Sequence, residues 1–65
     1  MPTYSIANMV ICEKYLLDTD PATEVFRSTN DTWYWNWYGE TTARGPFATR
    51  DEAETAAFEV LIDTP

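Results

Sequence analysis

The sequence predicts a small α+β domain: an antiparallel sheet of three to four strands with one C-terminal helix packed on one face. Two segments lead to this prediction. Residues 33–38 (Trp-Tyr-Trp-Asn-Trp-Tyr) are rich in aromatic residues, which favour pleated strands. Residues 49–62 combine a helix-capping signal with an alanine-rich stripe. With 65 residues in all, we expect a single domain over residues 1–65.

The N-terminal segment is ambiguous between strand and helix. Met9, Cys12 and Leu16 recur at helical spacing, whereas the β-branched residues 10–11 favour a strand. Turn formers follow at residues 18–21, before β-favouring residues resume. We therefore favour strand, turn and strand, and a helix over residues 5–16 is the alternative.

The aromatic segment at residues 33–38 follows a polar turn cluster at residues 28–32. Side chains alternate along a strand, so we expect one face to be core beneath the helix and the other to be exposed or half covered. The core face is Trp33, Trp35 and Trp37, and the opposite face is Tyr34, Asn36 and Tyr38.

A loop is expected at residues 39–45, leading into a brief strand around residues 43–47. Pro46 cannot donate a ladder hydrogen bond. This strand is therefore predicted to be an edge strand or an exit from the sheet.

The C-terminal helix has the clearest boundary signals. Thr49 and Glu52 form a capping box, and the helix should end near Ile62. One stripe at helical spacing would face the sheet, where small alanines leave room for the large Trp side chains. The stripe is Ala53, Ala56, Ala57, Val60 and Leu61.

Composition narrows the function classes. The net charge is −7, with eleven acidic and four basic residues. This argues against binding nucleic acid or anionic membranes and favours a protein partner with a basic surface. Without an N-terminal signal sequence or a long apolar run, we expect a cytoplasmic protein with no membrane association.

Catalytic and metal-binding groups are scarce. The chain has no histidine, one cysteine and two glycines, which disfavours general-base, zinc and phosphate-loop chemistry. Cys12 lies in an apolar stretch and is predicted to be a buried structural thiol. Carboxylate pairs at residues 18–20 and 51–52 are explained by turn formation and capping. We therefore predict no enzyme activity, no cofactor and no metal.

Residues 45–56 carry the motif Gly-x-Phe-x-Thr-x-x-Glu-Ala-x-x-Ala after a Trp-bearing strand. This motif resembles the end of AP2-type and integrase arm-type DNA-binding domains, and the pattern is also similar to short phage and bacterial proteins. The resemblance implies a sheet with a C-terminal helix packed across it. Such domains read DNA with Arg and Trp on the exposed strand face. Here that face has no basic residue, so the DNA-binding role is not implied.

The acidic residues are concentrated near the C-terminus. Residues 51–65 hold five acids and no base, whereas residues 1–50 hold six acids and four bases. We predict a non-catalytic protein-binding module, such as a phage-type inhibitor or nucleic-acid mimic that docks on a basic surface of a host protein or defence complex. A homodimeric accessory protein whose sheet faces pair and a degenerate nucleic-acid module are the alternatives. The candidate contacts are Tyr34, Asn36 and Tyr38 on the sheet, or Asp51, Glu54 and Glu59 on the helix.

Overall fold

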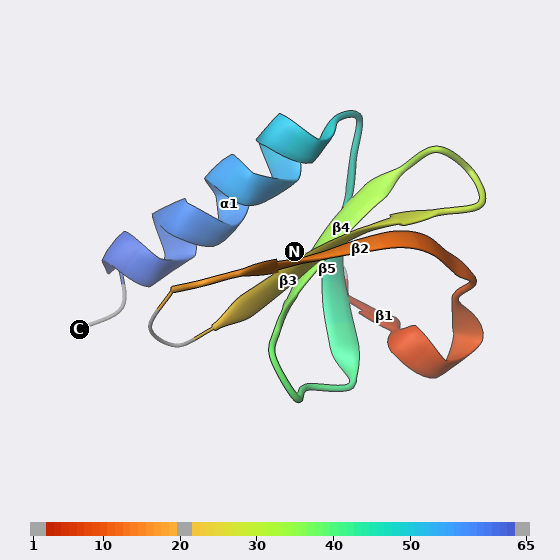
Figure 1. The fold of residues 1–65 in the computed structure, drawn as a ribbon, viewed down its shortest axis with the longest axis horizontal. Coiled ribbons are helices and arrows are strands. Elements are labelled where there is room, and N and C mark those ends of the chain that lie inside the picture. The colour runs from red at the N-terminus through yellow and green to blue at the C-terminus, as the bar shows by residue number, and fades with distance from the viewer. Residues whose placement is uncertain (1–2, 20–21, 64–65) are drawn as a thin grey trace.

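The fold is a five-stranded antiparallel sheet with one helix on one face (Figure 1). The computed structural model describes residues 3–19 and 22–63. The elements in chain order are β1 (Thr3–Ser5), a single 3-10 turn η1 (Ile6–Asn8), β2 (Ile11–Leu17), β3 (Thr23–Ser28), β4 (Trp33–Trp37), β5 (Thr42–Phe47) and α1 (Arg50–Asp63). The strand order is β1-β5-β4-β3-β2. This confirms the α+β class and the C-terminal helix.

The predicted strand number is wrong, because the sheet has five strands rather than three to four. The additional strand is β1, which pairs with β5 and places Thr3 opposite Arg44. This pairing joins segments about 40 residues apart in the sequence, so no local turn signal announces it.

The ambiguous N-terminal segment resolves largely into a strand. Residues 6–8 form the short η1, and β2 then pairs with β3 from Ile11 opposite Ser28 to Leu17 opposite Thr23. The hairpin prediction is confirmed, and the alternative helix does not form. Residues 20–21 of the expected turn lie outside the described residues.

Cys12 is exposed, so the prediction of a buried thiol is wrong. The β2–β3 register shifts between Ile11 and Glu13. This irregularity falls at Cys12 on the outermost strand, where only one neighbouring strand is present. An apolar sequence neighbourhood is therefore not enough to bury the thiol.

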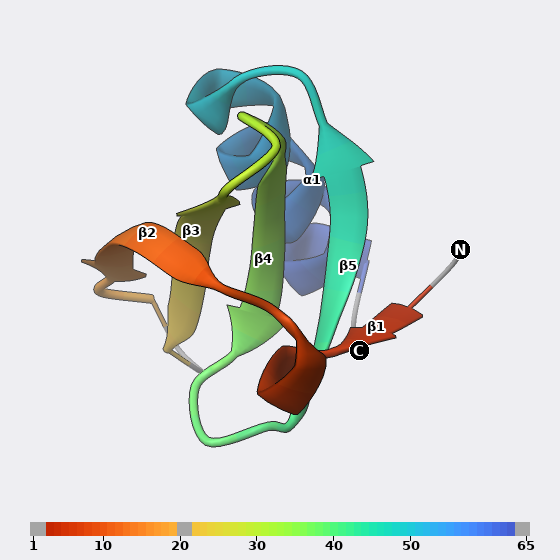
Figure 2. The ribbon, with the colours of Figure 1, turned by 90° about the vertical axis from the view of Figure 1, so that its right-hand side faces the viewer.

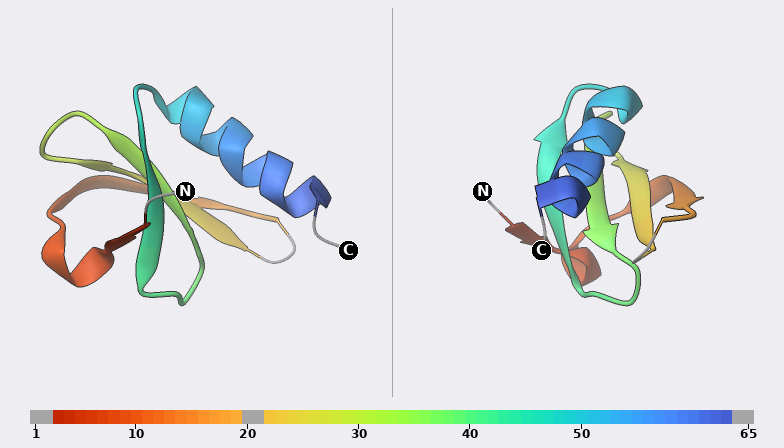
Figure 3. Two further views of the ribbon diagram at one scale, coloured as in Figure 1. Left: turned by 180° about the vertical axis from the view of Figure 1, so that it is seen from behind. Right: turned by 90° about the vertical axis from the view of Figure 1, so that its left-hand side faces the viewer.

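The helix packs its alanines against the Trp face of the sheet, as the alternation predicted. Trp35, Val25, Ala53 and Ala57 form a cluster with no exposed surface. Small residues on α1 let the helix approach the sheet closely enough for the Trp35 ring to fill the space between the layers. Figure 3 shows α1 lying along this face in two further views.

The helix begins with a capping arrangement. Thr49 Oγ1 accepts a hydrogen bond from the Glu52 backbone N–H at 3.2 Å. Glu52 Oε2 reaches back to accept from the Ala48 N–H at 3.1 Å. The first bond satisfies an N–H group that the helix itself leaves without a partner, and the second ties the residue before the cap to the first turn. The predicted cap is confirmed, although Glu52 reaches one residue further back than in a capping box. The helix ends at Asp63.

Strand β5 lies inside the sheet, between β1 and β4. Among the described residues, its pairing with β1 covers residues 42–44. The prediction of an edge strand is therefore wrong for residues 42–44. Pro46 does not mark an exit from the sheet either, because Phe47 still pairs with Trp33 of β4.

Candidate functional site

The two faces of the sheet have different covers. On one side, α1 lies over β3, β4 and β5. On the other side, a second cluster of Phe26, Tyr34 and Ala43 is covered in part by the segment that joins β1 to β2. Figure 2 shows the helix on the far side of the sheet and this N-terminal segment on the near side.

The expectation that Tyr34 and Asn36 are exposed or half covered is wrong. Tyr34 exposes 8% and Asn36 2% of its surface, whereas Tyr38 exposes 66%. Tyr34 stacks on Phe26 and meets the ring of Tyr4 edge to face. The cover comes from pairing between β1 and β5, which carries the N-terminal segment across this face.

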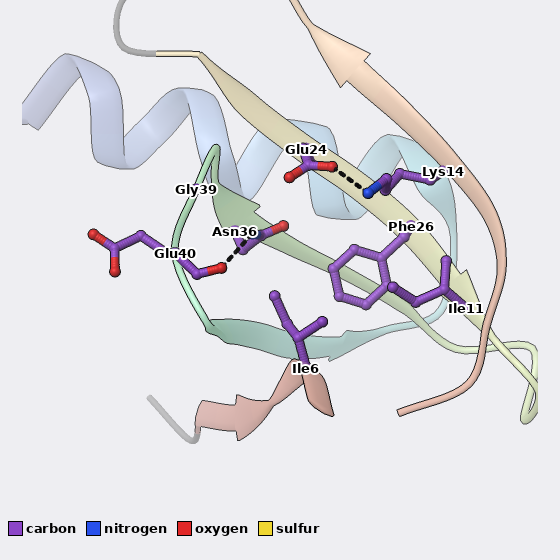
Figure 4. Close-up of a pocket in the computed structure, with 8 residues that line it drawn as sticks. All are labelled: Ile6, Ile11, Lys14, Glu24, Phe26, Asn36, Gly39 and Glu40. Atoms are coloured by element: carbon purple, nitrogen blue, oxygen red, sulfur yellow. Dashed lines mark hydrogen bonds and ion pairs between the residues drawn. The ribbon is translucent and has the colours of Figure 1, made fainter. Parts of the chain in front are cut away.

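A cavity of about 180 Å³ opens on this second face, beside the N-terminal segment. Its apolar wall is formed by Ile6, Ile11 and Phe26 (Figure 4). The remaining lining residues are Lys14, Glu24, Asn36, Gly39 and Glu40. The cavity therefore combines an apolar wall with a small number of polar groups, which is the usual composition of a binding pocket.

Asn36 has a buried amide oxygen without a hydrogen-bond partner. Its amide nitrogen donates to the Trp37 carbonyl at 2.9 Å and to the Glu40 carbonyl at 3.5 Å. Both partners are acceptors, so they require the NH2 group and fix the orientation of the amide. Figure 4 shows the oxygen on the side of the side chain away from Glu40.

Glu24 is the carboxylate of the cavity. Its side chain is 12% exposed, and Oε2 lies 2.9 Å from the ammonium group of Lys14, whose side chain is 55% exposed. In the register of β3 and β4, Glu24 lies opposite Asn36. Opposed residues of antiparallel strands point to the same face, so carboxylate and amide share this cavity.

The carboxylate of Glu40 lies outside the cavity that Glu24 and Asn36 share. Figure 4 shows it pointing away from the cavity, while the Glu40 carbonyl holds Asn36. The side-chain acceptors of the lining that face the cavity side are therefore the carboxylate of Glu24 and the buried amide oxygen of Asn36.

The predicted helix contacts lie in the other layer. Asp51 and Glu59 are exposed on α1, and Glu54 is half buried with its carboxylate 3.4 Å from Arg50 Nε. The structure thus separates the two predicted groups of contact residues, the sheet group from the helix group, and does not merge them into one patch.

All four basic side chains of the sequence contact other side chains of the chain. Lys14 pairs with Glu24, Arg50 with Glu54, and Arg27 with both Glu13 and Asp31. Arg44 lies over the ring of Trp35, 4.9 Å from its centroid. Among the residues whose side chains the structure describes, five carboxylates have no such counter-charge. They are Asp18, Glu40, Asp51, Glu52 and Glu59.

Sequence reasoning missed a polar cluster on β2. Glu13 accepts hydrogen bonds from Tyr15 at 2.9 Å and from Arg27 at 3.1 Å, and both bonds lower the pKa of its carboxyl group, that from Tyr15 most. The same bonds raise the pKa of Tyr15 and of Arg27. Arg50 at the start of α1 lies 3.9 Å above the Tyr15 ring. The cluster joins β2, β3 and α1. The one signal for it in the sequence is alternation, which places Glu13 and Tyr15 on the same face of β2.

Within the part of the chain that the structure describes, no three or more His, Cys, Asp or Glu side chains are grouped so that they could hold a metal ion. No helix in the same residues has the length and apolar character needed to cross a membrane. Comparisons with family models, curated proteins and solved structures find no match to this chain.

Proposed function

We propose that this chain is a non-catalytic binding module that docks on a basic surface of a partner protein. The observation that supports this most is the distribution of charge. Every cation contacts a side chain of the chain itself, while Asp18, Glu40, Asp51, Glu52 and Glu59 have no counter-charge among the described residues. The surface offered to a partner is therefore negative, and complementary charge accelerates encounter and selects partners.

The same charge distribution disfavours a nucleic-acid module. Phosphate binding needs clustered Lys and Arg that are free to contact the backbone. Here Lys14, Arg27 and Arg50 are in ion pairs, and Arg44 is held over Trp35. An inhibitor that occupies a basic site, including a site that normally holds nucleic acid, fits this surface better. We place its action in the cytoplasm, where a free thiol such as Cys12 stays reduced.

A homodimer formed through the free edge of β2 is less favoured. Edge strands resist pairing through bulges and through lysine side chains. Strand β2 has both, namely the register shift at Cys12 and the charged Lys14 in its centre. Sedimentation of the chain at high concentration tests this alternative, because an edge-paired dimer would sediment as twice the monomer mass.

Affinity capture from the native host, followed by identification of the captured proteins, tests the proposal. The two baits are the unchanged chain and the double variant Asp51→Asn with Glu59→Gln, which neutralises two exposed carboxylates. We expect a partner that the unchanged chain retains and the variant loses. Its retention should fall with salt, because the Debye length shortens from about 10 Å at 0.1 M to about 3 Å at 1 M. Equal capture by both baits, insensitive to salt, would contradict the proposal.

A further inference from the structure

We propose that the cavity beside β2, β3 and β4 receives one arginine side chain of the partner protein, an inference that rests on the proposed function. The first reason is the unpartnered amide oxygen of Asn36. A buried acceptor left without a donor lowers stability. Asn36 exposes 2% of its surface and is fixed by two backbone carbonyls. Rotation of the amide would lose both bonds, so a donor has to come from a ligand or from water.

The second reason is the kind of group that the cavity holds. Glu24 and Asn36 both present acceptor oxygens, and Oε2 of Glu24 is already paired with a cation of the chain. Among the side chains that line the cavity, the donors are the ammonium group of Lys14 and the NH2 group of Asn36, and the latter is already bonded to two carbonyls. Two acceptor side chains in one cavity favour a cationic donor. A guanidinium group has five N–H donors in a planar fork, and can bond a carboxylate and an amide oxygen together.

The third reason is size and polarity. About 180 Å³ is smaller than the roughly 300–1,000 Å³ of sites for drug-sized ligands. Ile6, Ile11 and Phe26 give an apolar wall on which the methylene stem of a long basic side chain can pack. These dimensions favour a single side chain over a nucleotide or a cofactor.

Lys14 acts in this arrangement as a built-in competitor. Its ammonium group lies 2.9 Å from Glu24, yet its side chain is 55% exposed. Water around the ammonium group screens its attraction to the carboxylate, which is itself largely buried. A displaced Lys14 side chain can return to solvent, and an arriving arginine takes its place on the carboxylate with the N–H groups of its planar fork.

The test is a titration of the isotope-labelled full chain with N-acetyl-arginine amide, followed by NMR. The neutral isostere N-acetyl-citrulline amide and N-acetyl-lysine amide are the matched probes. We expect saturable shifts of the Asn36 side-chain NH2 and of the Glu24 and Glu40 backbone amides, stronger with the arginine probe than with either of the others. Shifts that do not saturate, or that are the same with citrulline, would mean that water alone fills the cavity and would overturn the inference.

Variants at Glu24 and Lys14, with a control at Arg27, show whether a change in binding comes from the cavity and not from misfolding. Glu24→Gln preserves the shape of the side chain and should weaken binding about tenfold or more, since bonds to charged groups are the stronger ones. Lys14→Met removes the competitor and should tighten binding, whereas Arg27→Met, which removes the same charge away from the cavity, should not. Equal tightening by both lysine and arginine variants would assign the effect to net charge and reject the site.

The outcome is separable from that of the proposed function. Saturable shifts confined to the exposed acids Asp51 and Glu59 would reject the cavity and leave a basic partner in place. The opposite result is saturable binding in the cavity while the capture experiment yields no partner, or yields one that both baits retain equally. It would support the cavity as a guanidinium site and reject docking through the acidic surface.

Discussion

The two faces of the sheet differ in how completely they are closed. On the helix face, Trp35 packs on Ala53 and Ala57 with no exposed surface, and its indole Nε1 is buried without a hydrogen-bond partner. The opposite face is closed by a short segment of irregular chain, which leaves a cavity and a buried amide oxygen without a partner. Among the described residues, each face thus buries one unpartnered polar atom, which lowers stability. Only that of Asn36 belongs to a residue that lines a cavity, so the second face is the one suited to recognition.

One strand supplies both faces. Side chains of β4 alternate, so Trp35 enters the core beneath the helix while its neighbour Asn36 enters the cavity. A strand in the centre of the sheet has pairing partners on both sides, so it holds both side chains rigidly. Burying the unpartnered amide oxygen of Asn36 lowers stability. Complete burial of Trp35 on the other face offsets this loss.

The largest expected effect is on the helix face. Trp35→Ala should lower the free energy of unfolding by about 3–5 kcal/mol, because it removes a fully buried ring and leaves a cavity. Urea unfolding measures the change. Tyr38→Ala, at a residue that is 66% exposed, is the control and should stay within about 0.5 kcal/mol. A similar loss in both variants would remove the contrast between core and surface.

The next effect probes the second face through Gly45. A Cβ at this position would lie 2.5 Å from Cδ2 of Tyr34 and 2.9 Å from the Trp33 carbonyl oxygen. Gly45→Ala should therefore destabilise the chain by about 1–3 kcal/mol, as overpacking of a closed interior does. Thermal unfolding, with near-ultraviolet circular dichroism as a report on Tyr34, measures it. A change below about 0.5 kcal/mol would mean that this face is loosely packed.

Local signals of the helix face could be read from the sequence. Alternation placed Trp33, Trp35 and Trp37 on one side, and the Thr49 cap and alanine stripe located the helix that covers them. Each of these signals lies within a few residues of the structure that it specifies. They sufficed for the α+β class and for the helix-on-sheet packing.

The second face could not be read in the same way, because its cover comes from a distant segment. Pairing of Thr3 with Arg44 brings residues 6–11 over Tyr34, and no spacing in the sequence indicates that pairing. The same holds for the register shift that exposes Cys12 and for the cavity at Asn36, which draws on β2, β3, β4 and η1 together. Burial of the Tyr face was therefore missed, although the strand that carries it was identified.

A smaller effect tests the helix cap alone. Thr49→Ala removes the hydroxyl that accepts from the Glu52 N–H and should cost about 1 kcal/mol. Thr55→Ala, at an exposed position within α1, is the matched control and should be neutral or slightly stabilising because alanine favours helix. Loss of the cap should leave arginine binding in the cavity unchanged. A parallel loss of binding would mean that the two faces are coupled.

The smallest effect comes from Glu13, at the sheet edge where the helix face meets solvent. Hydrogen bonds from Tyr15 and Arg27 hold the pKa of Glu13 below its usual value of 4.5. The folded chain thus favours the ionised form, so the stability that Glu13 contributes is present above pH 4.5 and is lost as the pH falls through the lowered pKa.

Glu13→Gln should therefore be less stable than the unchanged chain at pH 7, and the difference should vanish as the pH falls below the folded-state pKa. Urea unfolding at a series of pH values from 7 to acid measures the difference. Glu59→Gln, which removes an exposed carboxylate without a counter-charge, is the control and should show no such pH-dependent loss. A Glu13→Gln difference that persists unchanged in acid would mean that the hydrogen bonds of Glu13 do not depend on its charge, and that the edge cluster is held by packing of Tyr15 between Trp33 and Arg50 instead.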